Sequence, residues 1–207
     1  AGVVQNSEEK REALQSSSTL AFRAPTLVLL PKTELCQTTQ VNFVGRDVLI
    51  VAESAKVATP LGKRLRSLQA NPLTVKSALA AEKVAQLTKA GTLAGVYYLT
   101  GLEGYDWKTG TTETWLNARK GLLTPLFELS QVLPESAFLI CATAMGGALG
   151  FFNAENPQEG LISGFAKALK RERPEQFIKG IDFSSSSKGA EIADILVNET
   201  LHDPVTV

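Results

Sequence analysis

Three uninterrupted apolar runs constrain this chain more than any other feature of its sequence. They are residues 47–52 (DVLIVA), 93–99 (LAGVYYL) and 137–141 (AFLIC). Strands with one solvated face alternate apolar and polar residues, whereas strands buried on both faces of a parallel sheet read as continuous apolar runs. Parallel neighbours need crossover connections, which are usually helices. The runs therefore predict an α/β fold in which helices cover both faces of a parallel sheet.

Segments with helical periodicity follow each of these runs. One expected helix begins near residue 60, and the others span residues 77–89, 111–133, 159–172 and 187–201. A weak strand is expected at 73–76 and a further strand at 177–183. Thr59 suits an N-cap and Pro60 suits the first helical position, and Asn71 with Pro72 ends that helix. The alternation of strand and helix, joined by right-handed crossovers, predicts a truncated Rossmann-like sheet.

Apolar side chains at helical spacing are expected to face the sheet. In the helix over residues 111–133 they are Trp115, Leu116, Leu122, Leu123, Leu126, Leu129 and Val132. In the two later helices they are Leu161, Phe165, Ala168 and Leu169, then Ile192, Ile195, Leu196 and Leu201. This pattern predicts that Trp115 packs in the core.

Composition excludes several classes of function. Lys plus Arg equals Asp plus Glu at 21 each, so the surface has no bulk attraction for nucleic acid or anionic lipid. No apolar run approaches the roughly 20 residues of a membrane helix. Cys36 and Cys141 cannot form a metal cluster alone; Cys141 is expected as a buried free thiol and His202 as a surface residue. The sequence predicts no metal site, no nucleic-acid or membrane partner, and a cytoplasmic location.

The expected domain boundary lies near residue 25. Residues 1–24 are polar and include a Ser-Ser-Ser-Thr run at 16–19, so they are predicted to be a linker. Residues 25–207 are predicted to form one Rossmann-like domain that opens with a short strand at 26–30 (TLVLL).

Residues 160–183 (GLISGFAKALKRERPEQFIKGIDF) resemble a segment of the short-chain dehydrogenases. They are more closely similar to the ketoreductase region of modular polyketide synthases and polyunsaturated-fatty-acid synthases. In that region a small residue opens a helix, a basic–acidic pair and a proline end it, and a strand finishes in Asp plus an apolar residue. The strands at 94–101 and 137–143 and the long helix between them follow the same template. The resemblance covers residues 47–207.

The turn that would hold a cofactor lacks the family's glycines. In dinucleotide-binding folds, glycines after the first strand let the backbone approach the pyrophosphate at a helix N-terminus. Here residues 52–62 read AESAKVATPLG, so only Gly62 remains, and it falls inside the expected helix. Glu53 would place a negative charge near the phosphates, and Lys56 is interpreted as solvated. No cofactor-binding residue is predicted in this chain.

The family's catalytic residues are also replaced. The resemblance implies a Ser on the loop after a strand and a Tyr-x-x-x-Lys pair at the start of the next helix, where Lys lowers the Tyr pKa for proton transfer. Alignment places Glu155 and Glu159 at the Tyr and Lys positions, and residues 142–144 at the Ser position. Because acids are favoured at a helix start, Glu155 and Glu159 are interpreted as solvated. No catalytic residue is predicted.

The strand spacing favours the non-catalytic half of such a ketoreductase. Between residues 47 and 93 there is room for one strand and two helices, where a cofactor-binding short-chain dehydrogenase usually has a further βα unit. The synthase ketoreductases consist of a truncated structural half and a catalytic half that binds NADPH and reduces the β-keto group. The resemblance implies that this chain is the structural half. Its partners would be the catalytic half, which holds the NADPH, and neighbouring synthase domains with an acyl carrier protein nearby.

Two other functions stay open on the sequence. A divergent NAD(P)-dependent reductase would use Thr143, Lys56 and the loop at residues 98–101. A scaffolding or binding module on a degenerate Rossmann fold would use none of them. The glycine-containing loop at 145–147 is expected to be flexible, and Trp107, in a polar loop, would mark a docking surface.

Overall fold

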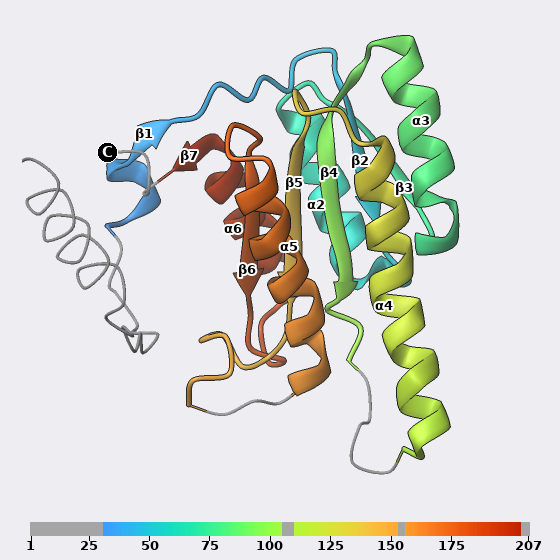
Figure 1. The fold of residues 1–207 in the computed structure, drawn as a ribbon. Helices are drawn as coiled ribbons and strands as arrows, with labels where there is room; N and C mark the ends of the chain where they lie inside the picture. Colours follow the sequence, from blue (N-terminus) through green and yellow to red (C-terminus); the bar gives the residue numbers. More distant parts are fainter. Residues whose placement is uncertain (1–30, 105–109, 153–155, 204–207) are drawn as a thin grey trace, which may run out of the picture.

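A five-stranded parallel sheet forms the centre of the fold in the computed structural model (Figure 1). The structure describes residues 31–104, 110–152 and 156–203. The sheet has the order β3-β2-β4-β5-β6, and its strands are β2 (Asp47–Val51), β3 (Asn71–Val75), β4 (Leu93–Gly101), β5 (Phe138–Thr143) and β6 (Ile178–Asp182). All four neighbouring pairs are parallel, which confirms the predicted truncated Rossmann-like α/β fold.

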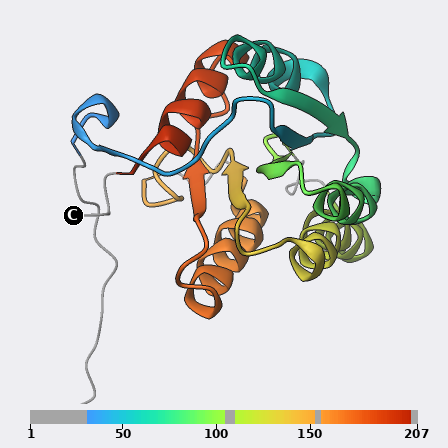
Figure 2. The same ribbon diagram turned by 90° about the horizontal axis from the view of Figure 1, so that it is seen from above.

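Helices cover both faces of this sheet, as Figure 2 shows from above. One layer contains α2 (Ala55–Ser67) and α6 (Gly189–Leu201), and the other contains α3 (Ala80–Ala90), α4 (Thr112–Val132) and α5 (Gly160–Glu172). Short 3-10 turns, η1 (Thr33–Leu35), η2 (Ser77–Leu79) and η3 (Pro157–Glu159), precede β1, α3 and α5. Within the described residues, no helix combines the length and apolar character needed to span a membrane.

The unbroken apolar runs are buried because each face of the sheet has its own core. Alternate residues of β4 point to opposite faces, so Tyr97 packs in the layer of α2 and α6 and Tyr98 packs in the layer of α3, α4 and α5. Cys141, on β5, is a fully buried free thiol, as predicted. Burial of such apolar area stabilises the fold by about 25 cal/mol per Å² removed from water.

The strand order reverses between β2 and β4. The chain runs from β2 outward to β3 and then crosses back over β2 to β4. Ligands of open α/β sheets bind at such a reversal, outside the carboxyl ends of the strands. Only β3 lies between β2 and β4 in sequence, so the predicted shortage of one βα unit is confirmed.

Helix α2 begins earlier than predicted. It starts at Ala55 after Ser54, and Pro60 lies inside it, so the prediction of Thr59 as N-cap is wrong. A proline interior to a helix loses one backbone bond and crowds the carbonyl four residues earlier. That carbonyl is Lys56 O, and Gly189 at the start of α6 packs directly on it: a Cβ on Gly189 would lie 2.2 Å from Lys56 O. The packing of α6 therefore stabilises a helix start that local sequence does not specify.

Several side chains predicted to face the core lie at the surface. They are Trp115, which is 42% exposed, and Leu116, Val132, Ala168 and Ile195. Only the later part of α4 packs on the sheet, through Leu126 and Leu129, because its first turns extend past the carboxyl edge of the strands (Figure 1). The Arg119 guanidinium lies 5.4 Å from the centre of the Trp115 ring and covers part of it.

A two-stranded antiparallel ribbon joins the two ends of the described fold. β1 (Gln37–Thr38) pairs with β7 (His202–Asp203). Beside it, Thr39 donates its backbone N–H to Leu201 O at 2.8 Å and its hydroxyl to Thr200 O at 2.7 Å. The sequence predicted neither of these strands, since a two-residue strand has no detectable periodicity.

Some sequence predictions fall outside the described residues. They are the linker at residues 1–24, the strand at 26–30, Trp107 and Glu155.

We predict that Gly95→Ala destabilises the fold. Gly95 on β4 lies opposite Phe138 on β5, and an added Cβ would lie 2.2 Å from the Phe138 ring. Displacing that ring from a packed core costs about 1–3 kcal/mol, which urea unfolding would measure as a lower free energy of unfolding. Gly180→Ala on β6 is the matched control, because a Cβ there meets nothing within 4 Å. Equal stability of the two variants would contradict this view of the β4–β5 core.

Candidate functional site

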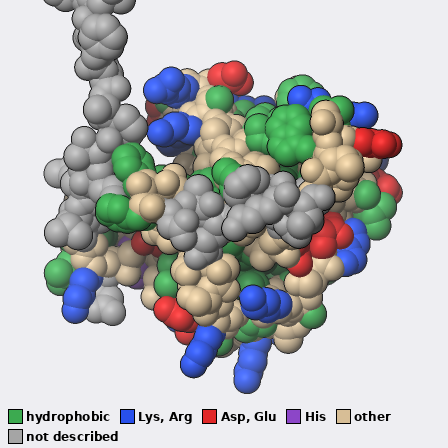
Figure 3. All heavy atoms as spheres, turned by 90° about the horizontal axis from the view of Figure 1, so that it is seen from below, with side chains coloured by type: hydrophobic (Ala, Val, Ile, Leu, Met, Phe, Trp, Pro, Cys, Tyr) green, Lys and Arg blue, Asp and Glu red, His purple; other side chains and the backbone are tan. Residues whose placement is uncertain are grey.

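The carboxyl ends of β2, β4 and β5 form the edge at which this fold would place a ligand site (Figure 3). The turn from β2 into α2, the segment after β4 and the loop between β5 and α5 meet there. Carboxylates accept backbone N–H groups in two of these places, the β2–α2 turn and the β5 loop, and the segment after β4 supplies one of these carboxylates, Glu103.

The turn from β2 into α2 is closed by Glu103. Its Oε1 accepts the backbone N–H of Ser54, the residue before α2, at 2.9 Å. Backbone N–H groups at a helix N-terminus attract anions, including the pyrophosphate of a dinucleotide. In this chain a carboxylate already lies at the turn that a phosphate would approach, and it brings negative charge of its own.

Glu53 closes the neighbouring turn after β3. Its Oε1 accepts the backbone N–H of Ser77 at 2.9 Å, and its Oε2 lies 3.6 Å from Lys76 Nζ. The Lys76 ammonium also donates to the backbone carbonyl of Glu53. Partial burial alone would raise the pKa of Glu53, but the Ser77 N–H and Lys76 together hold it below its ordinary value. Glu53 is therefore an anion at neutral pH.

Asp182, the last residue of β6, organises the loop after β5. Its Oδ1 accepts the Thr143 hydroxyl at 2.8 Å and the Met145 N–H at 2.7 Å, and its Oδ2 accepts the Leu149 N–H at 2.8 Å. Leu149 in this loop has a φ of 51°, a left-handed conformation that is unfavourable for a residue other than glycine, and its N–H bond to Asp182 stabilises it. The loop expected to be flexible is thus tied down at both ends.

Glu159 is not the solvated residue that the sequence predicted. It is only 1% exposed, and its Oε2 accepts the backbone N–H of Ala144 at 2.5 Å. Asn156 donates from its side-chain amide to Ala144 O at 3.0 Å, so the same loop residue is held from both sides. The prediction failed because η3 folds Glu159 inward against the β5 loop, which helix periodicity alone does not reveal.

The two described tyrosines are buried and hydrogen-bonded. Thr200 donates its hydroxyl to Leu196 O, so the Tyr97 phenol, 2.7 Å away, donates to Thr200. Tyr98 donates to Leu122 O at 2.8 Å. Burial raises the pKa of both phenols, and it raises that of the Cys141 thiol to about 12. None of these groups has the lowered pKa that proton transfer or nucleophilic attack at neutral pH needs.

The residues proposed for a divergent reductase are not brought together. Thr143 is buried and bonded to Asp182, whereas Lys56 is exposed on the first turn of α2. No hydrogen bond in the described part of the chain joins them. Likewise, no three His, Cys, Asp or Glu residues among those described could hold a metal ion.

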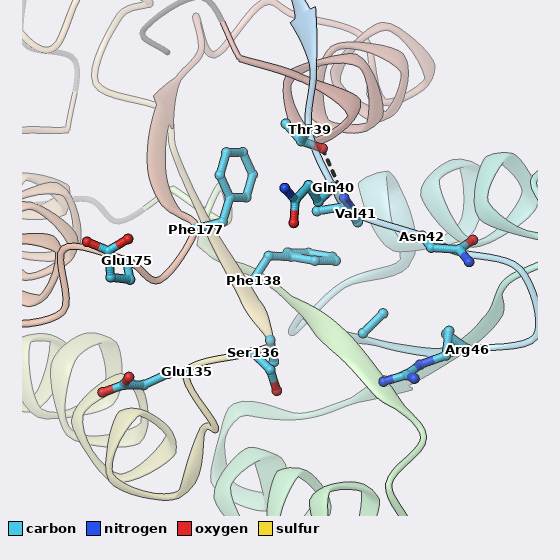
Figure 4. A pocket seen from close by; sticks show the side chains of 12 residues that line it. Thr39, Gln40, Val41, Asn42, Arg46, Glu135, Ser136, Phe138, Glu175 and Phe177 are labelled. Carbon is cyan, nitrogen blue, oxygen red and sulfur yellow. Dashed lines mark hydrogen bonds between the residues drawn. The ribbon is translucent and has the colours of Figure 1, made fainter.

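One cavity lies away from this edge. It measures about 490 Å³ and opens at the amino ends of the strands, where Phe138 and Phe177 lie between Arg46 on one side and Glu135 and Glu175 on the other (Figure 4). Arg46 already donates to Leu93 O at 2.9 Å. A cavity of about 410 Å³ borders the β2–α2 turn, and one of about 270 Å³ lies between the end of β4 and α4.

Sequence reasoning missed the roles of Glu103 and Asp182. The role of Asp182 could have been suspected, because an Asp at the end of that strand was part of the family resemblance. The role of Glu103 could not be predicted, because a single Glu in a polar loop is typically exposed to solvent.

Comparison with known proteins shows the fold. No family model matches the chain, and no curated protein matches it. The short-chain dehydrogenase/reductase of Serratia marcescens BCRC 10948 is 13% identical with a TM-score of 0.59, covering 80% of this chain and 94% of that one. A short-chain dehydrogenase/reductase from Brucella melitensis, described as a glucose/ribitol dehydrogenase, is 14% identical with a TM-score of 0.58, covering 79% and 92%.

A metagenomic short-chain oxidoreductase in complex with NADP is 12% identical with a TM-score of 0.56, covering 80% of this chain and 95% of that one. At these identities the likeness concerns the backbone alone. The chain has a short-chain dehydrogenase/reductase fold.

We predict that Asp182→Ala loosens the β5 loop. A hydrogen bond to a charged group contributes about 1.5–3 kcal/mol, so hydrogen exchange at the Met145 and Leu149 amides should become about 10–100-fold faster. Asp194→Ala is the control, because that exposed carboxylate on α6 only pairs with Arg64. Unchanged exchange at both amides in Asp182→Ala would show that the loop is held by other contacts.

We predict that Lys76→Met raises the pKa of Glu53. The folded pKa of Glu53 is lowered, so its contribution to stability is complete above the unfolded pKa and is lost as pH falls through the folded value. Removing the ammonium takes away part of that lowering, which a carboxyl-carbon NMR titration would detect. Lys89→Met, at the exposed end of α3, should leave the titration of Glu53 unchanged.

Proposed function

We propose that this chain is the non-catalytic structural half of a β-ketoacyl reductase in a polyketide or fatty-acid megasynthase. In this role it stabilises an NADPH-dependent catalytic half and binds no cofactor itself. The observation that carries the proposal is the closure of the carboxyl edge by the chain's own carboxylates, Glu103 at the β2–α2 turn and Glu159 and Asp182 at the β5 loop.

The first argument is electrostatic. A dinucleotide brings two phosphate charges to the β2–α2 turn, where Glu103 already places a carboxylate and the Glu53 carboxylate lies at the neighbouring turn after β3. Like charges a few ångströms apart repel by about 1 kcal/mol in water and by more near a protein surface. A phosphate would have to displace Glu103 from Ser54 before it could use that N–H.

The second argument concerns proton transfer. Reduction of a carbonyl requires a group near the hydride acceptor that supplies a proton. Glu159 stands at the family's Lys position and is bonded to a backbone amide instead. The Tyr98 phenol is fixed to Leu122 O in the core, and burial raises its pKa. The described residues at this edge therefore suit a structural role.

The third argument concerns the positions of the two ends of the described fold. The β1–β7 ribbon brings both ends of the described fold to one place. Domains whose ends lie close together are readily inserted into a longer polypeptide without disturbing it. This geometry favours a unit carried within a longer polypeptide beside a partner half.

An apolar surface for that partner is present at the carboxyl edge. Three large apolar side chains of the β5 loop lie at the surface, Leu149, Phe151 and Phe152, and Phe152 is 84% exposed. Exposed apolar clusters of this kind are typical of interaction sites. We assign this surface to contact with the catalytic half.

A divergent reductase acting alone is the second candidate. The fold likeness to an oxidoreductase in complex with NADP favours it. Titration of the purified chain with NADPH, followed by cofactor fluorescence, separates the two functions. The structural role predicts no change up to millimolar cofactor, whereas tight NADPH binding would overturn it.

We further predict that the chain stabilises the catalytic half of the same synthase. The catalytic half should unfold at a lower temperature and reduce a β-ketoacyl thioester more slowly without this chain than with it. Phe152→Ser should weaken this effect, because a polar side chain removes apolar contact area. Leu79→Ser, at an exposed position on η2, is the control. A catalytic half that is equally stable and active alone would contradict the proposal.

A further inference from the structure

The strand β6 forms one edge of the five-stranded sheet, and β3 forms the other. In Figure 1 β6 is the outermost strand beside β5, and among the described residues no strand pairs with its outer side. An edge strand presents a row of backbone N–H and C=O groups with which a further strand can pair. The two edges of this sheet differ in how well they are protected against such pairing.

The outer backbone groups of β6 belong to Ile178, Gly180 and Asp182. On the inner side, Phe177 O accepts a backbone N–H of β5 at 2.9 Å, and Phe183 donates its N–H to a backbone carbonyl of β5 at 2.8 Å. In a parallel sheet, residues that bond to one neighbouring strand alternate with residues that point away from it. The odd-numbered residues of this stretch therefore bond to β5, and the even-numbered ones point outward.

The edge at β3 is protected by a proline. Asn71 donates its N–H toward β2 at 2.8 Å, and Val75 O accepts an N–H from the end of β2 at 3.0 Å. By the same alternation, Pro72 and Thr74 point outward. Pro72 has no N–H to offer, and proline on an edge strand hinders further pairing. The edge at β6 contains no proline and keeps all of its outer N–H groups.

The charged side chains of β6 do not protect its edge either. A lysine on an edge strand commonly discourages pairing, but Lys179 is held by α6. Its Nζ lies 2.9 Å from Glu199 Oε2 and donates to Glu199 O at 3.0 Å. The Asp182 carboxylate is bonded to the β5 loop. Both charges are therefore directed to other parts of the fold.

Gly180, in the middle of β6, leaves room for another chain. It is exposed, and a Cβ there would meet nothing within 4 Å. A glycine inside a strand weakens the strand and often marks a place where another backbone approaches closely. On α6, the exposed Ile195 lies one turn before Glu199, on the side of the helix that reaches Lys179. An uncovered apolar side chain thus lies near the free edge.

We propose that β6 pairs in antiparallel fashion with β6 of a second copy of this chain, about a two-fold axis at Gly180. A two-fold axis brings the same surface of both copies together, and the two sheets become continuous. Ile178 then lies opposite Asp182 of the second copy, and Gly180 lies opposite its own equivalent. All three outward residues are in hydrogen-bonded pairs in this register.

The outward row of β6 is complementary to itself only about Gly180. A shift of the axis in either direction would leave at least one of the three outward residues beyond the end of the paired stretch. An axis at Lys179 or Asp182 would also place like charges opposite each other, which destabilises a strand pair. With the axis at Gly180, Lys179 faces Ile181 of the second copy. The contact is independent of the proposed structural role, because it does not use the apolar surface of the β5 loop.

Sedimentation equilibrium of the purified chain over a concentration series tests the pairing. We expect a weak, reversible dimer, since small edge contacts give weak complexes. Gly180→Pro removes the central outer N–H in both copies and leaves the bonds to β5 in place. The dissociation constant should rise about tenfold or more, the equivalent of two lost hydrogen bonds.

Thr74→Pro is the matched control, because it removes an outer N–H from the edge at β3. It should leave the dissociation constant unchanged. A chain that stays monomeric at millimolar concentration would leave the edge of β6 to a strand of another protein and would refute pairing between copies. A dimer that Gly180→Pro leaves as tight as before would do the same, because it must use another surface.

A crosslink tests the register without depending on how well Gly180→Pro folds. The α-carbons of a hydrogen-bonded antiparallel pair lie about 5.5 Å apart, within the range that a disulfide spans. In a Cys36→Ser background, oxidised Gly180→Cys should run as a covalent dimer on a non-reducing gel. Thr74→Cys in the same background should stay monomeric, and Cys141 is buried and does not compete. No crosslink in Gly180→Cys, or equal crosslinking of both variants, would exclude the two-fold contact at Gly180.

Discussion

Burial of both faces of β4 and β5 is the constraint on which the rest of this structure depends. Consecutive residues such as Tyr97 and Tyr98 enter separate cores, and each phenol reaches a hydrogen-bond partner within its own core. The two strands approach closely enough that Gly95 must lack a side chain beneath Phe138. With both faces covered by helices, the edges of the sheet are left for interactions with other molecules.

At the carboxyl edge, the chain satisfies its own turns with carboxylates. Glu103, Glu159 and Asp182 accept backbone N–H groups of Ser54 and of the β5 loop. In dinucleotide-binding members of this architecture, N–H groups at such a position meet phosphate oxygens. In this chain the corresponding N–H groups are hydrogen-bonded to the chain's own carboxylates, so the carboxyl edge carries negative charge.

The strands were predictable because burial on both faces leaves an unbroken apolar signal. The absence of a further βα unit was also predictable, since the interval between residues 47 and 93 is too short for it. The start of α2 was not, because Gly189 and Glu103 help fix it from distant parts of the chain. Trp115 was misjudged because helical periodicity does not reveal where a helix passes the end of the sheet it covers.

The sequence by itself determined the α/β class and the parallel sheet. These follow from residue type and short-range spacing. Only the tertiary structure decided that Glu159 is buried against Ala144 and that Glu103 lies at the α2 N-terminus. Each of these depends on contacts between segments far apart in sequence, and a carboxylate has the same local signature whether it is solvated or bonded to a distant backbone amide.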